Sequence, residues 1–416
     1  MKISLIQPSR NNLKYLKWSY NSIRKNQGDH EVEICVADDF SDKDNTWEWC
    51  QQTMKKDPLF KAIRNEGPKR LGHTILYDTL VNEVATNDIC MIYHADMYLC
   101  PGALDAIESN MFNTTHTGDA LYRQPIEKVI VSLTRIEPPL HPDGPEKILK
   151  DFGIETEEFK EQELLDFLSS RVPNNDTTEG IFAPWAFWKK DFQEIGGHDV
   201  IFAPQSKEDT DIFNRFHLNG IKFIQTWGGC VYHMTCRGSR FADGAQRNPN
   251  GEVFMKNRET DEWLTQNKKS TREFIRKWGH FCKHDELMKP IVPSKYDIGI
   301  CIKNCSNEVL EVLEPWCNII YTDANIDTYI SKESSKTSFD LSARVKNIDT
   351  QYTQGAHDII LEIDAARFYN TDMQVIEQIS EIISDSADIG EFELGNIKLL
   401  INDLSKYEKD LIVCKN

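Results

Sequence analysis

The sequence predicts an α/β protein in which a mostly parallel sheet, flanked by helices, is followed by a small C-terminal α/β domain. Short apolar runs alternate with segments of helical periodicity four times within about the first hundred residues, a pattern typical of parallel strands joined by helices. At 416 residues the chain is also longer than one ordinary domain. A turn-forming segment at Pro290 to Pro293 precedes further apolar runs. We therefore expect one domain over residues 1–290 and a second over residues 295–416.

The strands of the first domain are predicted from apolar runs that are too short for free-standing helices. They cover residues 3–6, 32–37, 60–63, 89–93, 129–134 and 221–226. Helical spacing of apolar residues predicts helices around residues 13–23, 47–49, 71–84 and 104–111, and two short amphipathic helices within 261–278. Residues 138–180 have a proline-rich opening and a charged helix near 155–168, so we interpret them as an insertion.

The second domain is predicted to be small, acidic and α/β. Strands are expected at residues 298–302, 318–321, 359–363 and 411–413, with a helix over 373–384. From residue 291 onward the chain has 11 Lys and Arg against 22 Asp and Glu. This domain shows no group of side chains with the spacing of a catalytic motif.

Composition argues against several classes of function. Hydrophobic residues make up 40% and charged residues 27% of the chain, as in ordinary soluble proteins. A formal net charge of −18 argues against nucleic acid as a partner. No apolar run approaches the ~20 residues of a transmembrane segment, and no signal peptide precedes the first strand. The 11 cysteines form no Cys-x-x-Cys motif, which favours reduced thiols in a cytoplasmic protein over disulfides or a zinc site.

Acidic residues follow two of the predicted strands. Asp38 and Asp39 come after the strand at 32–37, and His94-Ala95-Asp96 follows the strand at 89–93. The carboxyl ends of parallel strands meet at one rim of the sheet, where open α/β sheets bind ligands. We therefore expect these residues to share a site. An ordinary polar turn at each strand end is the alternative.

Two later segments carry further candidate residues. Ser206 is the predicted N-cap of a helix that begins with Glu208 and Asp209, which places carboxylates near the positive end of the helix. Ordinary helix capping would produce the same pattern. A later strand ends at His233, which is either a core histidine or a ligand.

Taken in order, these segments resemble the motifs of the nucleotide-diphospho-sugar glycosyltransferases of the GT-A fold, most closely family 2. The resemblance covers the chain to about residue 280. It rests on the opening strand and loop at 3–11, the loop Asp38-Asp39-Phe40-Ser41-Asp42, His94-Ala95-Asp96 at the place of an Asp-x-Asp motif, residues 192–199, and Glu208-Asp209 with Asp211 and Arg215. The sequence departs from the family pattern at His94, where Asp is usual, at His198, where Phe is usual, and in the acidic loop, which is one residue short.

The resemblance implies transfer of a sugar from a nucleotide-diphosphate donor, a UDP- or GDP-sugar, to a hydroxyl of a glycan or another acceptor, with inversion at the anomeric carbon. It implies Mn²⁺ or Mg²⁺ as the cofactor, held by Asp96 and His233, with Asp209 as general base and Glu208 positioning the acceptor. Expected donor contacts are Pro8, Ser9, Arg10, Asp38, Asp39, Gly67, Arg70, His94, Arg237 and Arg240, and expected acceptor contacts are Trp185 and Trp188. A solvated basic loop is the alternative for the last two arginines, and core packing is the alternative for the tryptophans.

Two other classes of protein remain open. A sugar-1-phosphate nucleotidyltransferase also has a parallel sheet and a metal, but it would carry a glycine-rich basic loop directly after the first strand. Residues 7–10 contain no glycine. A non-catalytic protein that binds a nucleotide sugar or a glycan is favoured by His94 and disfavoured by the intact pair Glu208 and Asp209.

Overall fold

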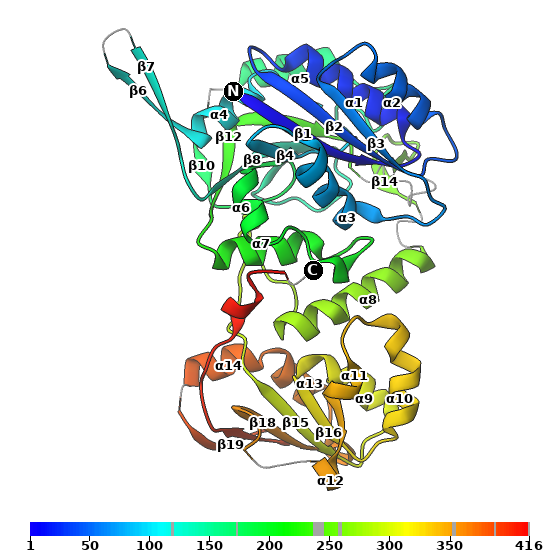
Figure 1. The fold of residues 1–416 in the computed structure, drawn as a ribbon, viewed down its shortest axis with the longest axis vertical. Coiled ribbons are helices and arrows are strands. Elements are labelled where there is room, and N and C mark those ends of the chain that lie inside the picture. The colour runs from blue at the N-terminus through cyan, green and yellow to red at the C-terminus, as the bar shows by residue number, and fades with distance from the viewer. Residues whose placement is uncertain are drawn as a thin grey trace.

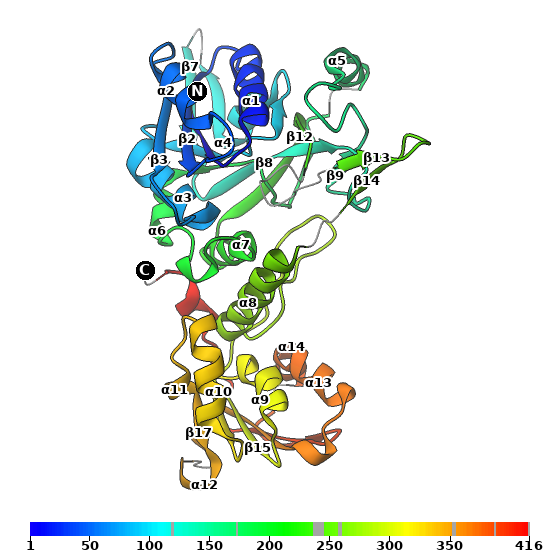
Figure 2. The ribbon, with the colours of Figure 1, turned by 90° about the vertical axis from the view of Figure 1, so that its right-hand side faces the viewer.

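The computed structural model describes residues 1–117, 120–171, 174–235, 245–256, 260–351, 355–386 and 388–414. It contains two α/β units, which we call the N-terminal and C-terminal units, stacked along the long axis of the molecule (Figure 1). Helix α8 (Asp261–Trp278) lies between them, as the view turned by 90° shows (Figure 2). None of the helices in these ranges combines the length and the apolar character that crossing a membrane requires.

A mixed sheet forms the centre of the N-terminal unit, with the strand order β10-β12-β8-β11-β4-β1-β2-β3. The strands β4, β1, β2 and β3 run parallel, β11 is antiparallel to both of its neighbours, and β12 is parallel to β8. At the side, β5 pairs with β12 and β9 pairs with β8. The bounds are β1 (Lys2–Ser9), β2 (Glu31–Asp39), β3 (Phe60–Asn65), β4 (Ile89–Ile92), β5 (Met97–Leu99), β8 (Val129–Glu137), β9 (Lys147–Leu149), β10 (Thr177–Thr178), β11 (Trp185–Trp188) and β12 (Lys222–His233). All residues of β4 and β8 are buried, as expected for strands covered on both faces.

Helices cover this sheet (Figure 1). Their bounds are α1 (Leu13–Asn26), α2 (Thr46–Met54), α3 (Gly72–Thr79) with the π-helical turn η1 (Leu80–Val84), α4 (Ala103–Met111), α5 (Glu161–Ser170), α6 (Lys189–Glu194), η2 (Val200–Phe202) and α7 (Glu208–Leu218). A hairpin of β6 (Phe112–Thr117) and β7 (Ala120–Pro125) projects from the unit, and β13 (Ala245–Arg247) pairs with β14 (Val253–Met255). The predicted fold class, a mostly parallel mixed sheet flanked by helices, is confirmed.

The C-terminal unit is a second α/β layer structure with the strand order β17-β16-β15-β18-β20-β19. The first four strands are parallel, and β20 is antiparallel to both neighbours. Its strands are β15 (Ile298–Lys303), β16 (Ile319–Thr322), β17 (Val345–Asn347), β18 (Ile359–Asp364), β19 (Gly390–Leu394) and β20 (Ile397–Ile401). Its helices are α9 (Asn307–Leu313), η3 (Glu314–Trp316), α10 (Ile326–Glu333), η4 (Ser334–Lys336), α11 (Leu341–Arg344), α12 (Ile348–Gln351), η5 (Ala365–Arg367), α13 (Asn370–Glu377) and α14 (Ile379–Ser386). The predicted small α/β domain is therefore observed.

Three sequence-based expectations about local structure are wrong. Residues 261–278 form one helix rather than two, because Thr260 caps its start and Gly279 ends it in the left-handed conformation. The predicted strand at 411–413 is absent, since Leu411 ends the 3₁₀ turn η6 (Glu408–Leu411) and packs against residues of α8 and the N-terminal unit. The segments at 221–226 and 230–233 are one strand, β12, with a register shift between them.

Helix α8 packs on both units. Phe274 and Trp278 form a buried cluster with Phe202 of the N-terminal unit, whereas Ile275 belongs to the core of the C-terminal unit. The predicted boundary near residues 290–295 remains a prediction. The structure adds that α8 before this boundary, and the terminal residues after it, contact the opposite unit.

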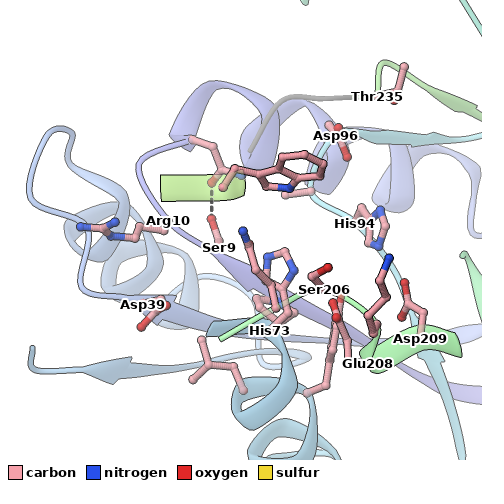
Figure 3. A pocket seen from close by; sticks show the side chains of 18 of the residues that line it. Ser9, Arg10, Asp39, His73, His94, Asp96, Ser206, Glu208, Asp209 and Thr235 are labelled. Carbon is pink, nitrogen blue, oxygen red and sulfur yellow. Dashed lines mark hydrogen bonds between the residues drawn. The ribbon is translucent and has the colours of Figure 1, made fainter. Parts of the chain in front are cut away.

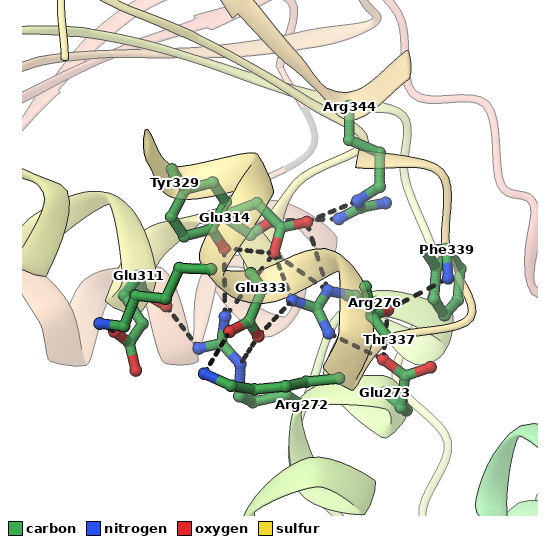
Figure 4. A network of polar contacts seen from close by, with 12 residues as sticks. Arg272, Glu273, Arg276, Glu311, Glu314, Tyr329, Glu333, Thr337, Phe339 and Arg344 are labelled. Atoms are coloured by element: carbon green, nitrogen blue, oxygen red, sulfur yellow. Dashed lines mark hydrogen bonds and ion pairs between the residues drawn. The ribbon is translucent and has the colours of Figure 1, made fainter. Parts of the chain in front are cut away.

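Buried ion pairs attach α8 to the C-terminal unit (Figure 4). Arg276 Nη2 contacts Glu314 Oε2 at 2.7 Å and Glu333 Oε1 at 3.2 Å, and Arg276 Nη1 contacts Glu273 Oε1 at 2.7 Å. Arg272 Nε contacts Glu333 Oε1 at 2.9 Å. Removing one partner of such a pair leaves a buried charge without compensation, which lowers the free energy of unfolding far more than the loss of an exposed pair does.

Replacing Arg276 by alanine is therefore expected to lower the free energy of unfolding by about 3–5 kcal/mol, measured by urea denaturation. A matched control is Lys268→Ala on the same helix, which removes a surface pair with Glu311 whose lysine is 70% exposed. That control is expected to cost less than about 1 kcal/mol. Equal losses for the two variants would contradict the structural role of the buried network.

Candidate functional site

A cavity of about 610 Å³ lies at the carboxyl ends of β1, β2 and β4, where the sequence predicted a shared site (Figure 3). The first turn of α7, the first two turns of α8 and residues of α3 complete its wall. Ten of the predicted site residues line it, namely Pro8, Ser9, Arg10, Asp39, Arg70, His94, Asp96, Glu208, Asp209 and His233. In Figure 3, Arg10 and Asp39 lie at one end of the cavity and His94, Asp96 and Asp209 lie at the other.

Sheet pairing brings Asp96 and His233 together although they are far apart in the sequence. Met97 of β5 stands opposite His233 of β12 in an antiparallel pair, so the residue before β5 lies beside the end of β12. His233 Nε2 is 3.4 Å from Asp96 Oδ1, and the rings of His94 and His233 have their centroids 5.6 Å apart. One ligand atom each of His94, Asp96 and His233 lies within 4.8 Å of the other two. We call these three residues the His-Asp-His cluster.

Glu137, at the end of β8, supports this cluster. Its Oε1 atom lies 2.9 Å from His233 Nδ1 and 3.0 Å from Arg135 Nη1. Because Nδ1 faces a carboxylate, Nε2 is the ring nitrogen that faces Asp96 and the cavity. A carboxylate behind a histidine in this way orients the ring and makes it a better metal ligand. Sequence reasoning missed Glu137, which lies beyond the predicted end of its strand.

Electrostatics in the cluster are strongly coupled. Burial alone would lower the pKa of His233, but the carboxylates of Asp96 and Glu137 raise it to about 9. Burial, helped by the neighbouring His233, lowers the pKa of His94 to about 3. Although burial opposes it, His233 holds the pKa of the Asp96 carboxyl well below its usual range. The site thus offers an ionised carboxylate, a neutral imidazole and a second imidazole whose proton a cation would displace.

The two acids after β2 have different roles. Asp39 lines the cavity, and its carboxylate accepts hydrogen bonds from the backbone N–H groups of Leu71 and Gly72 at 2.9 and 3.0 Å, at the start of α3. Asp38 is fully buried, accepts hydrogen bonds from Ser41 and does not line the cavity. Asp38 therefore shapes the loop, and the expected donor contact rests on Asp39.

Glu208 and Asp209, which we call the acidic pair, begin α7 and line the cavity. The N-cap is Lys207 rather than the predicted Ser206, and no side chain caps the helix. Burial raises the pKa of Asp209 above its ordinary value, although His198 opposes the shift. Asp211 does not line the cavity but forms a buried ion pair with Arg215 at 2.8 Å, and has a structural role.

Five further predicted contacts either do not reach the cavity or lie outside the described residues. Trp185 and Trp188 are 0% and 8% exposed within β11, where Trp185 packs against Phe213, so they form core rather than acceptor contacts. Arg237 and Arg240 lie outside the described residues. Gly67 does not line the cavity either; it has φ +66 and sits so close to the Phe40 ring that a Cβ would approach it to 2.2 Å.

Sequence reasoning also missed several residues of the cavity wall. Tyr77 of α3 lines it and stacks on His198, whose Nδ1 lies 2.7 Å from Asp78 Oδ1. Trp263 and Asn267 reach it from α8. The sequence did carry a signal for Tyr77, because it departs from the family pattern at His198, the residue on which Tyr77 stacks. The position of α8 depends on contacts that no local pattern shows.

Comparison with known proteins gives a family match for the first part of the chain. Residues 4–195 match the model of glycosyl transferase family 2, so the resemblance to GT-A family 2 glycosyltransferases is confirmed. The matched segment contains Asp39 and Asp96 and ends before α7 and β12. No curated protein matches the sequence.

Solved structures show only distant similarity. GalNAc-T7 with UDP, GalNAc and Mn²⁺ is 14% identical, with a TM-score of 0.41 over 56% of this chain and 43% of that chain. S. aureus TarS 1–349 with UDP-GlcNAc is 14% identical, with a TM-score of 0.36 over 57% of this chain and 61% of that chain. The mannosyltransferase PcManGT from Pyrobaculum calidifontis with GDP-Man and Mn²⁺ is 14% identical, with a TM-score of 0.39 over 93% of this chain and 87% of that chain.

Proposed function

We propose that this chain, which matches glycosyl transferase family 2 over residues 4–195, is a metal-dependent, inverting glycosyltransferase that moves a sugar from a nucleotide-diphosphate donor to an acceptor hydroxyl. One observation carries the proposal. A single cavity holds the His-Asp-His cluster and the acidic pair, so a site for a metal that binds the diphosphate and a base for the acceptor hydroxyl face the same cavity. A cytoplasmic location remains a prediction; the ten cysteines in the described part of the chain are free thiols.

The donor is assigned to the end of the cavity that carries Arg10 and Asp39. Asp39 is held by backbone N–H groups and offers carboxylate oxygens to ribose or base groups. Arg10 and Arg70 line the same region and supply positive charge for an anionic nucleotide. These features support a UDP- or GDP-sugar as the donor.

The His-Asp-His cluster fits a divalent cation. It combines one carboxylate with two imidazoles whose ligand atoms lie within 4.8 Å of one another, and Glu137 contacts the other ring nitrogen of His233. Imidazole ligands suit Mn²⁺ better than Mg²⁺, which prefers oxygen ligands. A cation bound there would neutralise the charge that develops on the leaving diphosphate.

The acidic pair is assigned to the acceptor. Asp209, whose pKa burial raises, takes the proton of the attacking hydroxyl as general base, and Glu208 orients the acceptor. The other carboxylates that line the cavity in the described residues, Asp39 and Asp96, are assigned to the donor and the metal, so this assignment leaves no separate carboxylate to form a covalent intermediate. Direct displacement, and hence inversion, is the mechanism that these residues support.

Replacing His94 by aspartate is expected to shift metal preference toward Mg²⁺. The change replaces an imidazole by a carboxylate, so the ratio of activity with Mg²⁺ to activity with Mn²⁺ should rise by about tenfold. Titration of donor consumption with each metal measures this ratio. Glu163→Ala, at an exposed position of α5, is a control that should leave it unchanged. A variant with the wild-type ratio would contradict the assignment of His94 to the metal.

The proposed function is tested by a screen of UDP- and GDP-sugars with and without Mn²⁺. The thermal midpoint is expected to rise only when donor and metal are both present, and slow release of UDP or GDP should follow. Donor binding without release of nucleotide, even with a panel of glycan acceptors, would identify a binding protein instead. Production of pyrophosphate from a sugar phosphate and a nucleoside triphosphate would identify a nucleotidyltransferase.

A further inference from the structure

Helix α8 carries side chains that hold the backbone directly before the acidic pair. The carbonyl oxygen of Gln205 accepts hydrogen bonds from Gln266 Nε2 and from Ser270 Oγ, each at 3.2 Å. At the next residue, Ser206 Oγ donates to Asn267 Oδ1 at 2.9 Å. Three side chains on one face of α8 therefore contact two consecutive residues of the loop that leads into α7.

This loop has a conformation that it would not keep without such contacts. Ser206 and Lys207 both lie in the left-handed region, with φ of 82° and 74°. Residues with a Cβ rarely adopt this region, and two in succession persist only where surrounding contacts fix the backbone. The described contacts of Gln205 and Ser206 with side chains come from α8. The direction in which the acidic pair faces the cavity depends on this loop.

A second set of contacts fixes α7 just beyond the acidic pair. Lys277 Nζ lies 2.6 Å from Asp211 Oδ1, and Trp278 Nε1 donates to the same oxygen at 2.9 Å. The side chains of Asp211 and Trp278 are fully buried. Residues 266–270 of α8 therefore hold the chain before the acidic pair, and its last two residues hold the chain after it.

The opposite face of α8 is held by the C-terminal unit. Arg272 and Arg276 reach Glu314 and Glu333 of that unit in the network of Figure 4. A continuous series of direct contacts thus joins the C-terminal unit to α8, and α8 to the loop at residues 205–206.

We propose that α8 positions the acidic pair for the transfer step, with Asn267 as a positioning residue that acts through Ser206, and that the C-terminal unit serves this step by holding α8. The proposal rests on the proposed function, because it takes Asp209 as the base. It gives the C-terminal unit a role in acceptor chemistry without requiring it to bind either substrate. Misplacing a reacting group by about 1 Å can cost up to about 100-fold in rate.

The test is a double-mutant cycle with Asn267→Ala and Ser206→Ala in the full chain. Each single variant is expected to lower kcat by about tenfold at saturating acceptor, with the KM for the donor unchanged. The double variant should be no slower than either single variant, since both remove the same hydrogen bond. Asn267→Asp keeps an acceptor oxygen for Ser206 and should restore most of kcat when assayed at pH 8. Thr265→Ala, at an exposed position of α8, is the control.

Losses that multiply in the double variant would show that Asn267 acts independently of Ser206, and would overturn the proposal. Arg272→Met is the test of the C-terminal unit, and is expected to lower kcat several-fold with an unchanged donor KM. An unchanged kcat would refute this part. Amide hydrogen exchange of peptides covering residues 203–210 needs no substrate, and Asn267→Ala should accelerate it. If exchange is accelerated but the wild-type chain consumes no nucleotide sugar, the proposed function is wrong, whereas the inference that α8 fixes this loop stands. If exchange is unchanged, the inference that α8 fixes the loop is wrong.

Discussion

Replacing Asp96 by alanine is expected to abolish the joint stabilisation of the chain by Mn²⁺ and a nucleoside diphosphate, and to lower turnover by about 10³-fold or more. Asp96 supplies the carboxylate of the His-Asp-His cluster, and its ionised form is favoured by His233. Without it, two imidazoles remain, and a hard cation loses its one anionic protein ligand. Thermal shift and isothermal calorimetry with Mn²⁺ and UDP or GDP measure the binding loss separately from the rate.

Two further variants make this experiment specific. Glu137→Gln keeps the shape of the residue behind His233 but removes its charge, and should weaken metal binding by about 10–100-fold. Glu163→Ala lies on the exposed surface of α5 and should change nothing. If the Asp96 variant binds metal and nucleotide as tightly as the wild type, the metal site lies elsewhere in the molecule.

The strands that carry the site could be predicted because they are buried on both faces. The run at residues 89–92 contains no polar residue, so it does not have the mixed pattern of a surface helix, and all four residues are buried in β4. The run at 411–413 looks the same in sequence but is not a strand. Leu411 is apolar because it packs against α8 and the N-terminal unit, which is a contact that no short window of sequence contains.

The same distinction separates the site residues that could be predicted from those that could not. Asp39 and Asp96 follow strands that must end at the same rim of a parallel sheet, so topology alone places them together. Asn267 reaches the cavity only because α8 is held between the two units. Trp185 was predicted to contact the acceptor from its residue type alone, but an aromatic residue in an apolar run is equally compatible with stacking on a sugar and with a core strand. Because Trp185 is fully buried, it is a core residue.

Replacing Asp209 by asparagine is expected to lower turnover by about 10²–10⁴-fold while leaving donor affinity nearly unchanged. The substitution keeps the size of the side chain and removes its ability to take a proton. Donor affinity should survive because Asp209 lies at the end of the cavity away from Arg10 and Asp39 (Figure 3). Glu208→Gln is the companion variant, and should raise the KM for the acceptor more than it lowers kcat. Equal losses of donor affinity and turnover in the Asp209 variant would contradict its assignment as the base.

The pH profile and the product stereochemistry complete the argument for Asp209. A base must be ionised to accept a proton, so turnover should fall as pH decreases through the pKa of Asp209. Because burial raises that pKa above its ordinary value of 3.8, the fall should occur at a higher pH than for an exposed aspartate. The residual activity of Asp209→Asn should lack this acid limb. A base that activates the acceptor hydroxyl for direct attack gives a product of inverted anomeric configuration, which proton NMR of the released product measures. A product that keeps the configuration of the donor would exclude direct displacement, and with it the assigned role of Asp209.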